Sequence, residues 1–179
     1  MRVVAGTAGG LRLVAPPGQA TRPTSDRVRE ATFNALESMG VIDDATVLDL
    51  FAGSGAMGIE ALSRGARHAT FVDNDAKARD VIRQNVEHTH LADRAAVVAG
   101  DAFAYLATSS TFDLAVLDPP YSFDRWFDVW RVLPAEVAVA ESDRAIEPGE
   151  GWAVMRSRRY GTTVVTICRR SHAIEETST

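Results

Sequence analysis

The sequence contains very little cysteine and no long apolar run. Cys168 is the only cysteine, which excludes an internal disulfide and fits a reducing compartment such as the cytoplasm. No apolar stretch approaches the roughly 20 residues of a membrane-spanning helix. The first residues also lack the apolar run of a signal peptide. Repeats and low-complexity segments are absent, so the 179 residues predict a cytoplasmic protein of about one domain.

Charge is distributed unevenly along the chain, whose net charge is −5. Residues 1–29 contain five arginines and one acid, and residues 152–170 contain five arginines and no acid. Residues 93–151 contain eleven acids and four arginines. A protein with this asymmetry can bind phosphate with one face although its net charge is negative. The alternative is that these arginines are simply solvated on ordinary elements.

The apolar pattern predicts an α/β fold. Helices are expected at 26–39, 56–64, 76–89, 102–107 and 124–132, and strands at 46–50, 69–73, 95–99, 113–118 and 136–141. Alternation of this kind is typical of a parallel sheet with helices on both faces. A final antiparallel pair is expected at 152–157 and 162–169, which makes seven strands, most of them parallel. Residues 2–6 and 11–15 predict an N-terminal β-hairpin.

Residues 47–58 combine an apolar strand, a glycine-rich turn and the start of a helix. They contain the spacing G-x-G-x-x-G, which allows positive φ and a close approach of the backbone to a ligand. Nicotinamide and flavin enzymes share this spacing. Asp49, four residues before Gly53, favours S-adenosylmethionine instead, because it can pair with a ligand ammonium, whereas a pyrophosphate gains nothing from an acid. Phe51 packs beside the cofactor or in the core.

Acidic residues stand at or just after the ends of four predicted strands, at Asp49, Asp73, Asp101 and Asp118. The carboxyl ends of parallel strands meet at one edge of the sheet, where ligands bind. We expect Asp73 to hold both ribose hydroxyls of the cofactor. Asp75 is a weaker candidate for that role, because it can cap the next helix. Asp101 can accept a hydrogen bond from the adenine amino group, or it can cap its own helix.

The turn Asp118-Pro119-Pro120-Tyr121 indicates the chemistry. An exocyclic amine on a base is a poor nucleophile because its lone pair is delocalised into the ring. The Asp118 side chain and the Pro119 carbonyl can accept hydrogen bonds from that NH₂ and direct its lone pair toward a methyl group. The prolines fix the backbone and add no competing N–H, and Tyr121 can stack on a flipped base. The enzyme then mostly supplies orientation for the displacement.

Other reactive side chains carry weaker signals. Cys168 lies in the middle of a predicted strand, so burial is favoured over a role as the thiolate nucleophile of cytosine C5 methylation. His88 and His90 have no partner that would complete a metal site. Trp126 and Trp130 lie at helical spacing and are expected in the core.

Several motifs in combination resemble the RsmD family. They are Arg-Pro-Thr-Ser-Asp-Arg-Val-Arg-Glu at 22–30, Asp-Leu-Phe-Ala-Gly-Ser-Gly at 49–55, Glu-Ala-Leu-Ser-Arg-Gly-Ala at 60–66 and Asp-Pro-Pro-Tyr at 118–121. The opening residues 2–13 are also similar to the family's RNA-facing element. The likeness spans about residues 1–121. Members of this family are bacterial methyltransferases that modify guanine N2 in small-subunit ribosomal RNA.

The resemblance implies a class I S-adenosylmethionine-dependent methyltransferase fold, Rossmann-like, with an N-terminal β-hairpin. Residues 1–20 would form the RNA-facing hairpin, residues 21–172 the methyltransferase domain, and residues 173–179 a disordered tail. The Arg-Pro-Thr segment would close over the cofactor. In the alternative reading this segment only caps a helix, and Arg27 and Arg29 are solvated. The family is understood to act on assembled or partly assembled ribosomal subunits, and we expect a monomer without a metal.

The candidate residues are as follows. The catalytic candidates are Asp118, Pro119, Pro120 and Tyr121. The cofactor-binding candidates are Arg22, Pro23, Thr24, Asp49, Phe51, Ala52, Gly53, Gly55, Asp73, Asn74, Asp101 and Ala102. The RNA-binding candidates are Arg2, Arg12, Arg156, Arg158 and Arg159.

Two other functions compete with ribosomal RNA methylation. A DNA amino-methyltransferase acting on adenine N6 or cytosine N4 also uses Asp-Pro-Pro-Tyr, but this chain has no separate target-recognition domain. An RNA-binding assembly factor could retain the fold without turnover, although the intact residues 118–121 speak against lost chemistry.

Overall fold

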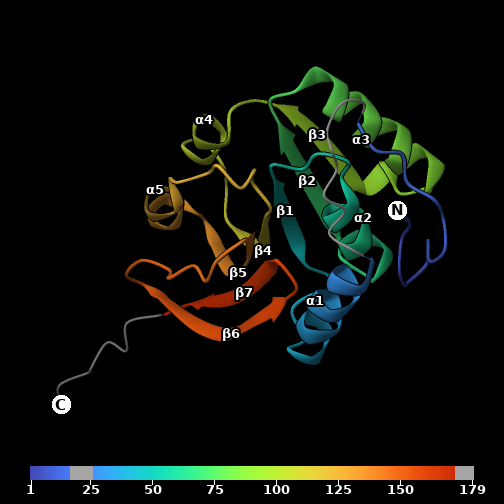
Figure 1. Cartoon of the computed structure of the whole chain (residues 1–179). Helices are drawn as coiled ribbons and strands as arrows, with labels where there is room; N and C mark the ends of the chain where they lie inside the picture. Colours follow the sequence, from blue (N-terminus) through green and yellow to red (C-terminus); the bar gives the residue numbers. More distant parts are fainter. Residues whose placement is uncertain (17–25, 172–179) are drawn as a thin grey trace, which may run out of the picture.

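A seven-stranded sheet forms the centre of the molecule, with helices on both of its faces (Figure 1). The computed structural model describes residues 1–16 and 26–171. The strands are ordered β3-β2-β1-β4-β5-β7-β6. Strands β1 to β5 are parallel, and β7 and β6 continue the sheet in antiparallel pairing. This architecture confirms the predicted fold class.

The bounds of the elements follow the predicted pattern closely. The strands are β1 (Thr46–Leu50), β2 (His68–Asp73), β3 (Ala95–Ala99), β4 (Phe112–Leu117), β5 (Ala135–Ser142), β6 (Trp152–Tyr160) and β7 (Thr163–Arg170). The helices are α1 (Asp26–Ser38), α2 (Ala56–Ser63), α3 (Ala76–His88), the 3₁₀ helix η1 (Ala92–Arg94), α4 (Ala102–Leu106) and α5 (Trp126–Val132). Only η1 has no counterpart in the sequence prediction.

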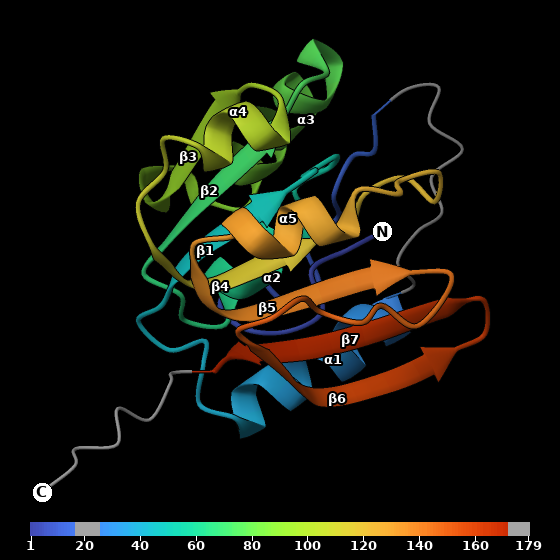
Figure 2. The same ribbon diagram turned by 90° about the vertical axis from the view of Figure 1, so that its left-hand side faces the viewer.

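Two apolar cores lie on the two faces of the sheet. Phe33, Ile59 and Ile82 bring α1, α2 and α3 onto one face, and Leu106 and Trp130 bring α4 and α5 onto the other. Figure 2 shows α4 and α5 on the near side of the sheet, and α1 and α3 behind it. Successive residues of a strand point to opposite faces, so each buried central strand supplies both cores. No described helix is both long and apolar enough to cross a membrane.

The strand order reverses between β1 and β4. From β1 the chain passes outward through β2 and β3, and it then returns to β4 on the other side of β1. Leu50 and Leu117 are register partners at the carboxyl ends of these two strands. A crevice outside the carboxyl ends at such a switch point is where open α/β sheets bind ligands.

The predicted N-terminal hairpin is correct in direction but wrong in extent. Arg2 and Arg12 form a single antiparallel bridge, and no regular strand surrounds it. The Val3 N–H donates to the Leu11 carbonyl, and the Gly10 N–H donates to the Val3 carbonyl, both at 2.9 Å. Longer strands do not form because the following backbone groups have partners on the helices instead.

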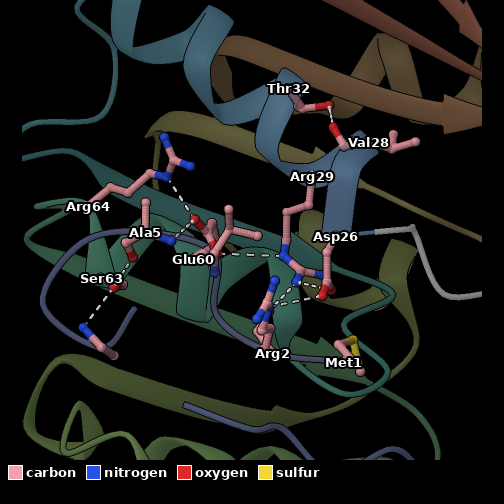
Figure 3. A network of polar contacts seen from close by, with 12 residues as sticks. Met1, Arg2, Ala5, Asp26, Val28, Arg29, Thr32, Glu60, Ser63 and Arg64 are labelled. Carbon is pink, nitrogen blue, oxygen red and sulfur yellow. Dashed lines mark hydrogen bonds and ion pairs between the residues drawn. The ribbon is translucent and has the colours of Figure 1, made fainter. Parts of the chain in front are cut away.

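Helix α2 supplies most of these partners. The N–H groups of Val4 and Ala5 donate to the Glu60 carboxylate at 2.7 and 3.1 Å. The Thr7 N–H donates to the Ser63 carbonyl at 2.8 Å. Figure 3 shows Ala5 of this segment beside Glu60 and Ser63 of α2. All eight residues of α2 are buried, because the sheet covers one side and the N-terminal segment covers another. The N-terminal segment therefore belongs to the core of the fold. The predicted boundary at residues 20 and 21 and the tail 173–179 lie outside the described residues.

Strand β6 forms one edge of the sheet and is exposed on both faces. Every residue from 153 to 159 is exposed, including the candidate arginines Arg156, Arg158 and Arg159. Trp152 anchors the start of the strand, since its indole N–H donates to the Trp130 carbonyl at 3.1 Å. Arginines on an edge strand also oppose pairing with the edge of another sheet.

Candidate active site at the carboxyl edge of the sheet

A cavity of about 670 Å³ opens at the carboxyl ends of β1, β2 and β4. It is bordered by twelve of the predicted site residues: Asp49, Phe51, Ala52, Gly53, Asp73, Asn74, Asp101, Ala102, Asp118, Pro119, Pro120 and Tyr121. Gly55 does not border it, and Arg22, Pro23 and Thr24 lie outside the described residues. The cofactor and catalytic candidates thus converge on one space, as the positions of the strand ends predicted.

The loop after β1 is held in a tight turn by backbone contacts with β2. Phe51 adopts a positive φ of 66°, which is rare for a residue with a side chain. The Ala52 N–H donates to the Val72 carbonyl at 3.1 Å, and the Gly53 N–H donates to Asp73 Oδ2 at 2.8 Å. Strain at Phe51 is compatible with a site whose surroundings over-determine the backbone.

The three glycines of the motif occupy two different environments, the cavity and the core. Gly53 borders the cavity. A Cβ at Gly55 would lie 3.3 Å from Ile82 and from the Phe71 ring, so this glycine is packed toward α3. A Cβ at Gly58 would lie 2.3 Å from the same ring. The last two glycines therefore permit close packing of helix and strand, and the prediction that Gly55 contacts the cofactor has no support from its position.

Asp73 is oriented by two backbone N–H groups. Its Oδ2 accepts from Gly53 at 2.8 Å, and its Oδ1 accepts from Asp75 at 2.9 Å. The carboxylate is partly exposed and faces the cavity at the end of β2. Asp75 itself caps α3 by accepting from the Lys77 N–H at 2.9 Å, which was the alternative considered for it.

Asp101 caps its own helix, which is one of the two roles that the sequence left open, and it also borders the cavity. Its Oδ1 caps α4 by accepting from Phe103 and Ala104, at 2.9 and 3.2 Å. The residue is exposed and also borders the cavity. A carboxylate has two oxygens, so capping through Oδ1 leaves Oδ2 for a ligand donor.

Asp49 is buried beneath the loop, and its Oδ2 accepts the Gly58 N–H at 2.8 Å. Burial raises the pKa of this carboxyl from 3.8 to about 8, against the lowering effect of the Gly58 hydrogen bond. The negative charges of Asp118 and Asp73 raise the pKa further. Three acids from three strand ends therefore lie close enough to interact, and a cation placed among them would favour the ionised forms.

We expect Asp49→Asn to remove a pH dependence of stability. The folded protein keeps a proton on Asp49 up to about pH 8, whereas the unfolded chain releases it near pH 3.8. Raising the pH through this window therefore stabilises the unfolded state relative to the folded state, by up to about 6 kcal/mol above pH 8. Asparagine retains an acceptor for the Gly58 N–H, so the variant should be the more stable protein at pH 8 and should lose little at pH 4.

Urea unfolding of both proteins at pH 4, 6 and 8 measures this effect. The difference between the two free energies of unfolding isolates Asp49, because all other titrating groups are shared. Equal pH slopes for the two proteins would show that Asp49 is ionised in the folded state.

The turn after β4 presents the catalytic candidates. Asp118 is half-buried, Pro119 is buried, and Tyr121 is exposed. The Phe123 N–H donates to the Pro120 carbonyl at 2.8 Å and closes the turn. The ring of Phe123 then packs on Phe51, with centroids 5.2 Å apart. The turn after β4 is thereby braced against the loop after β1.

Two alternatives are resolved by burial. Trp126 and Trp130 are core residues, as expected. Cys168 is completely buried in β7, and burial raises the pKa of its thiol to about 11. It does not border the cavity, so it is no candidate nucleophile. In the described part of the chain, no three metal-binding side chains gather into a group.

The candidate RNA-binding arginines occupy two separate places. Arg2 and Arg12 lie in the N-terminal segment, where Arg2 Nε is 3.5 Å from the Asp26 carboxylate. Arg156 and Arg158 border a small hollow against α1, and Arg159 donates to the Asp143 carbonyl at 3.4 Å. Their contact with RNA stays a prediction.

Two charged cavity residues were missed by sequence reasoning. Glu141 ends the predicted strand 136–141, so the rule that found the other strand-end acids would have found it. Arg29 was considered only as a solvated residue, yet its side chain is completely buried. The one sequence signal for its burial was the helical spacing that places Arg29 on the same face of α1 as Phe33 and Leu36.

Known proteins match this chain over most of its length. A family model described as "Conserved hypothetical protein 95" matches residues 1–169. The putative rRNA methyltransferase YlbH of Bacillus subtilis is 39% identical over 95% of this chain and 99% of its own length. The ribosomal RNA small subunit methyltransferase D of Escherichia coli is 42% identical over 68% of this chain and 60% of its own length.

A solved structure agrees with these sequence relatives. The putative methyltransferase yhhF from Escherichia coli has a TM-score of 0.84 at 32% identity, with 96% of this chain and 98% of that chain covered. The class I methyltransferase architecture and the motif resemblance point to the same group of proteins. The chain therefore belongs to the RsmD family.

Proposed function

We propose that this protein transfers a methyl group from S-adenosylmethionine to the exocyclic N2 of a guanine in small-subunit ribosomal RNA. The observation that carries the proposal is the convergence of Asp49, Asp73 and Asp118 on one cavity, with the turn 118–121 at its border. The names of the Bacillus and Escherichia relatives support ribosomal RNA as the substrate.

The charges around the cavity suit this cofactor. S-adenosylmethionine, when bound, supplies an electrophilic methyl group on a positively charged sulfonium. Asp73 would hold the ribose hydroxyls, Asp101 the adenine amino group, and Asp49 the cationic amino-acid end. The glycine loop lies next to the Asp73 carboxylate, which would repel the pyrophosphate of a dinucleotide.

The turn after β4 would hold the target base. Asp118 and the Pro119 carbonyl would accept hydrogen bonds from the guanine NH₂, which orients the nitrogen and restores its lone pair. Tyr121 is 39% exposed, so its ring is accessible to stack on a base flipped out of its helix. Proton loss from the methylated nitrogen would then proceed through Asp118 or solvent.

The arginines would bind the RNA backbone outside the cavity. Arg158 and Arg159 lie near the end of β6, which runs antiparallel to β7 and therefore ends at the same edge of the sheet as β4. Arg2 and Arg12 would contribute from the N-terminal segment. We further propose that the enzyme acts in the cytoplasm, as a monomer and without a metal, on an assembled or partly assembled small subunit.

The test is a methyl-transfer assay on three substrates. Purified protein and labelled S-adenosylmethionine are incubated with undermethylated small subunits, with naked ribosomal RNA and with duplex DNA, and the products are digested to nucleosides. We expect N2-methylguanosine, with more label from subunits than from naked RNA.

The other outcomes distinguish the competing functions. Labelled adenine or cytosine from DNA, with unlabelled RNA, would establish a DNA amino-methyltransferase. RNA binding with no label in any substrate would favour an assembly factor without turnover.

A further inference from the structure

Arg29 is the one basic side chain that borders the cavity in the described part of the chain. The other charged residues on its border are all acids: Asp49, Asp73, Asp75, Asp101, Asp118 and Glu141. Among these charged side chains, only that of Arg29 would attract a ligand that carries a carboxylate.

One nitrogen of the Arg29 guanidinium, Nη1, has no hydrogen-bond acceptor in the described part of the chain. Its Nη2 donates to Asp26 Oδ1 at 2.9 Å and to the Arg2 carbonyl, and its Nε lies 3.5 Å from Glu60 Oε2 (Figure 3). Its Nη1 has no acceptor among residues 1–16 and 26–171, although the side chain is completely buried. Buried donors nearly always have a hydrogen-bond partner, so a bound anion is the expected acceptor for this Nη1.

Glu60 cannot neutralise Arg29 fully, because other groups share its carboxylate. Arg64 Nε donates to Glu60 Oε1 at 2.7 Å, and the Val4 and Ala5 N–H groups donate to the same carboxylate. The longer distance from Glu60 to Arg29, 3.5 Å, is consistent with this competition. Asp26 also pairs with Arg29, but through Nη2. Neither carboxylate occupies Nη1, which therefore remains available to a ligand.

We propose that Arg29 is a carboxylate subsite, which binds the α-carboxylate of the amino-acid portion of the cofactor. This inference rests on the proposed use of S-adenosylmethionine. The sulfonium and ammonium of that cofactor suit the acidic side of the cavity, and its carboxylate needs a cation. A phosphate of the RNA backbone is a poorer occupant, because it is flanked by nucleotides on both sides, whereas the carboxylate is the terminal group of a small molecule and can approach a buried side chain more closely.

The experiment compares S-adenosylmethionine with decarboxylated S-adenosylmethionine, which lacks only this carboxylate. Titration calorimetry measures both affinities for the full-length protein. We expect the unaltered protein to prefer S-adenosylmethionine by about 10-fold to 100-fold, the effect of a charge-assisted hydrogen bond. In Arg29→Met this ratio should fall to one or below, because the acids favour the additional net positive charge of the decarboxylated ligand. Arg29→Lys should give an intermediate ratio.

Arg64→Met is the matched control. Arg64 is almost as buried as Arg29 and pairs with the same Glu60, but it does not border the cavity. The control should lose stability and keep the preference of the unaltered protein. Equal loss of preference in both variants would assign the effect to Glu60 and the general packing, and would overturn the subsite.

The outcomes separate this inference from the proposed function. An unaltered protein that binds both ligands equally would overturn the subsite and leave the cofactor in place. A protein that binds neither ligand would overturn both. If Arg29→Met does not fold, Arg29→Lys decides, since an unchanged ratio in that variant would also refute the subsite.

Discussion

Replacing Asp118 with alanine should lower the rate of methyl transfer by about 10²-fold to 10³-fold, the usual effect of deleting one preorganised hydrogen-bonding group at a reacting centre. Asp118 directly follows β4, is half-buried and borders the cavity. Its carboxylate would accept a hydrogen bond from the target amine. Without this hydrogen bond, the lone pair of the amine nitrogen stays delocalised into the ring, and the nitrogen remains a poor nucleophile. The loss should fall on kcat, while the KM for the cofactor stays within about threefold, because the interaction forms with the other substrate.

Asp124→Ala is the matched control for this prediction. Asp124 lies in the same loop, is exposed, and does not border the cavity. The two variants and the unaltered protein are compared by initial rates on small subunits and by cofactor titration. Methyl transfer that survives Asp118→Ala at the rate of Asp124→Ala would refute the catalytic role of the turn.

Replacing Gly6 with alanine should destabilise the protein by about 3 to 5 kcal/mol, the sum of a strained positive φ and an overpacked contact. Gly6 has a φ of +82°, and a Cβ there would lie 1.9 Å from the Ser63 carbonyl oxygen. Helix α2 is buried on every side and cannot yield. The N-terminal segment would have to lift, which would expose Val3, Ala8 and Leu13.

Gly10→Ala separates the two contributions. Gly10 has a similar φ of +87°, but a Cβ there would meet no atom within 4 Å. This variant should therefore lose only about 1 to 2 kcal/mol, from the left-handed backbone alone. Urea unfolding of both variants gives the two free energies. Similar losses would mean that the N-terminal segment is free to move away from α2, contrary to its buried position.

Much of this site was predictable from local sequence because its parts are consecutive. An apolar strand, an acid and a glycine turn follow one another in residues 47–58, and the alternation of strands with helices brings the carboxyl ends of the parallel strands to the same edge. Asp73 and Asp118 could be placed for that reason. Chain order also separates the parallel strands from the final antiparallel pair.

The N-terminal segment shows where local reasoning stops. Its residues have the pattern of a hairpin, but their backbone groups bond to Glu60, 55 positions away from Ala5. Nothing in residues 2–13 indicates that a distant helix supplies these acceptors. Because it does, only a single bridge forms in place of the predicted strands. The packing of Gly55 was not predictable for the same reason, since its neighbours Ile82 and Phe71 come from α3 and β2.

The sequence by itself determined the class of fold, the edge of the sheet that holds the cavity, and most of the side chains around it. These follow from periodicity and chain order, which are local properties. Only the tertiary structure decided that Arg29 is buried, that the pKa of Asp49 is raised to about 8, and that the N-terminal segment is part of the core. Burial and electrostatic interaction depend on neighbours from distant parts of the chain, and those neighbours are brought together only by folding.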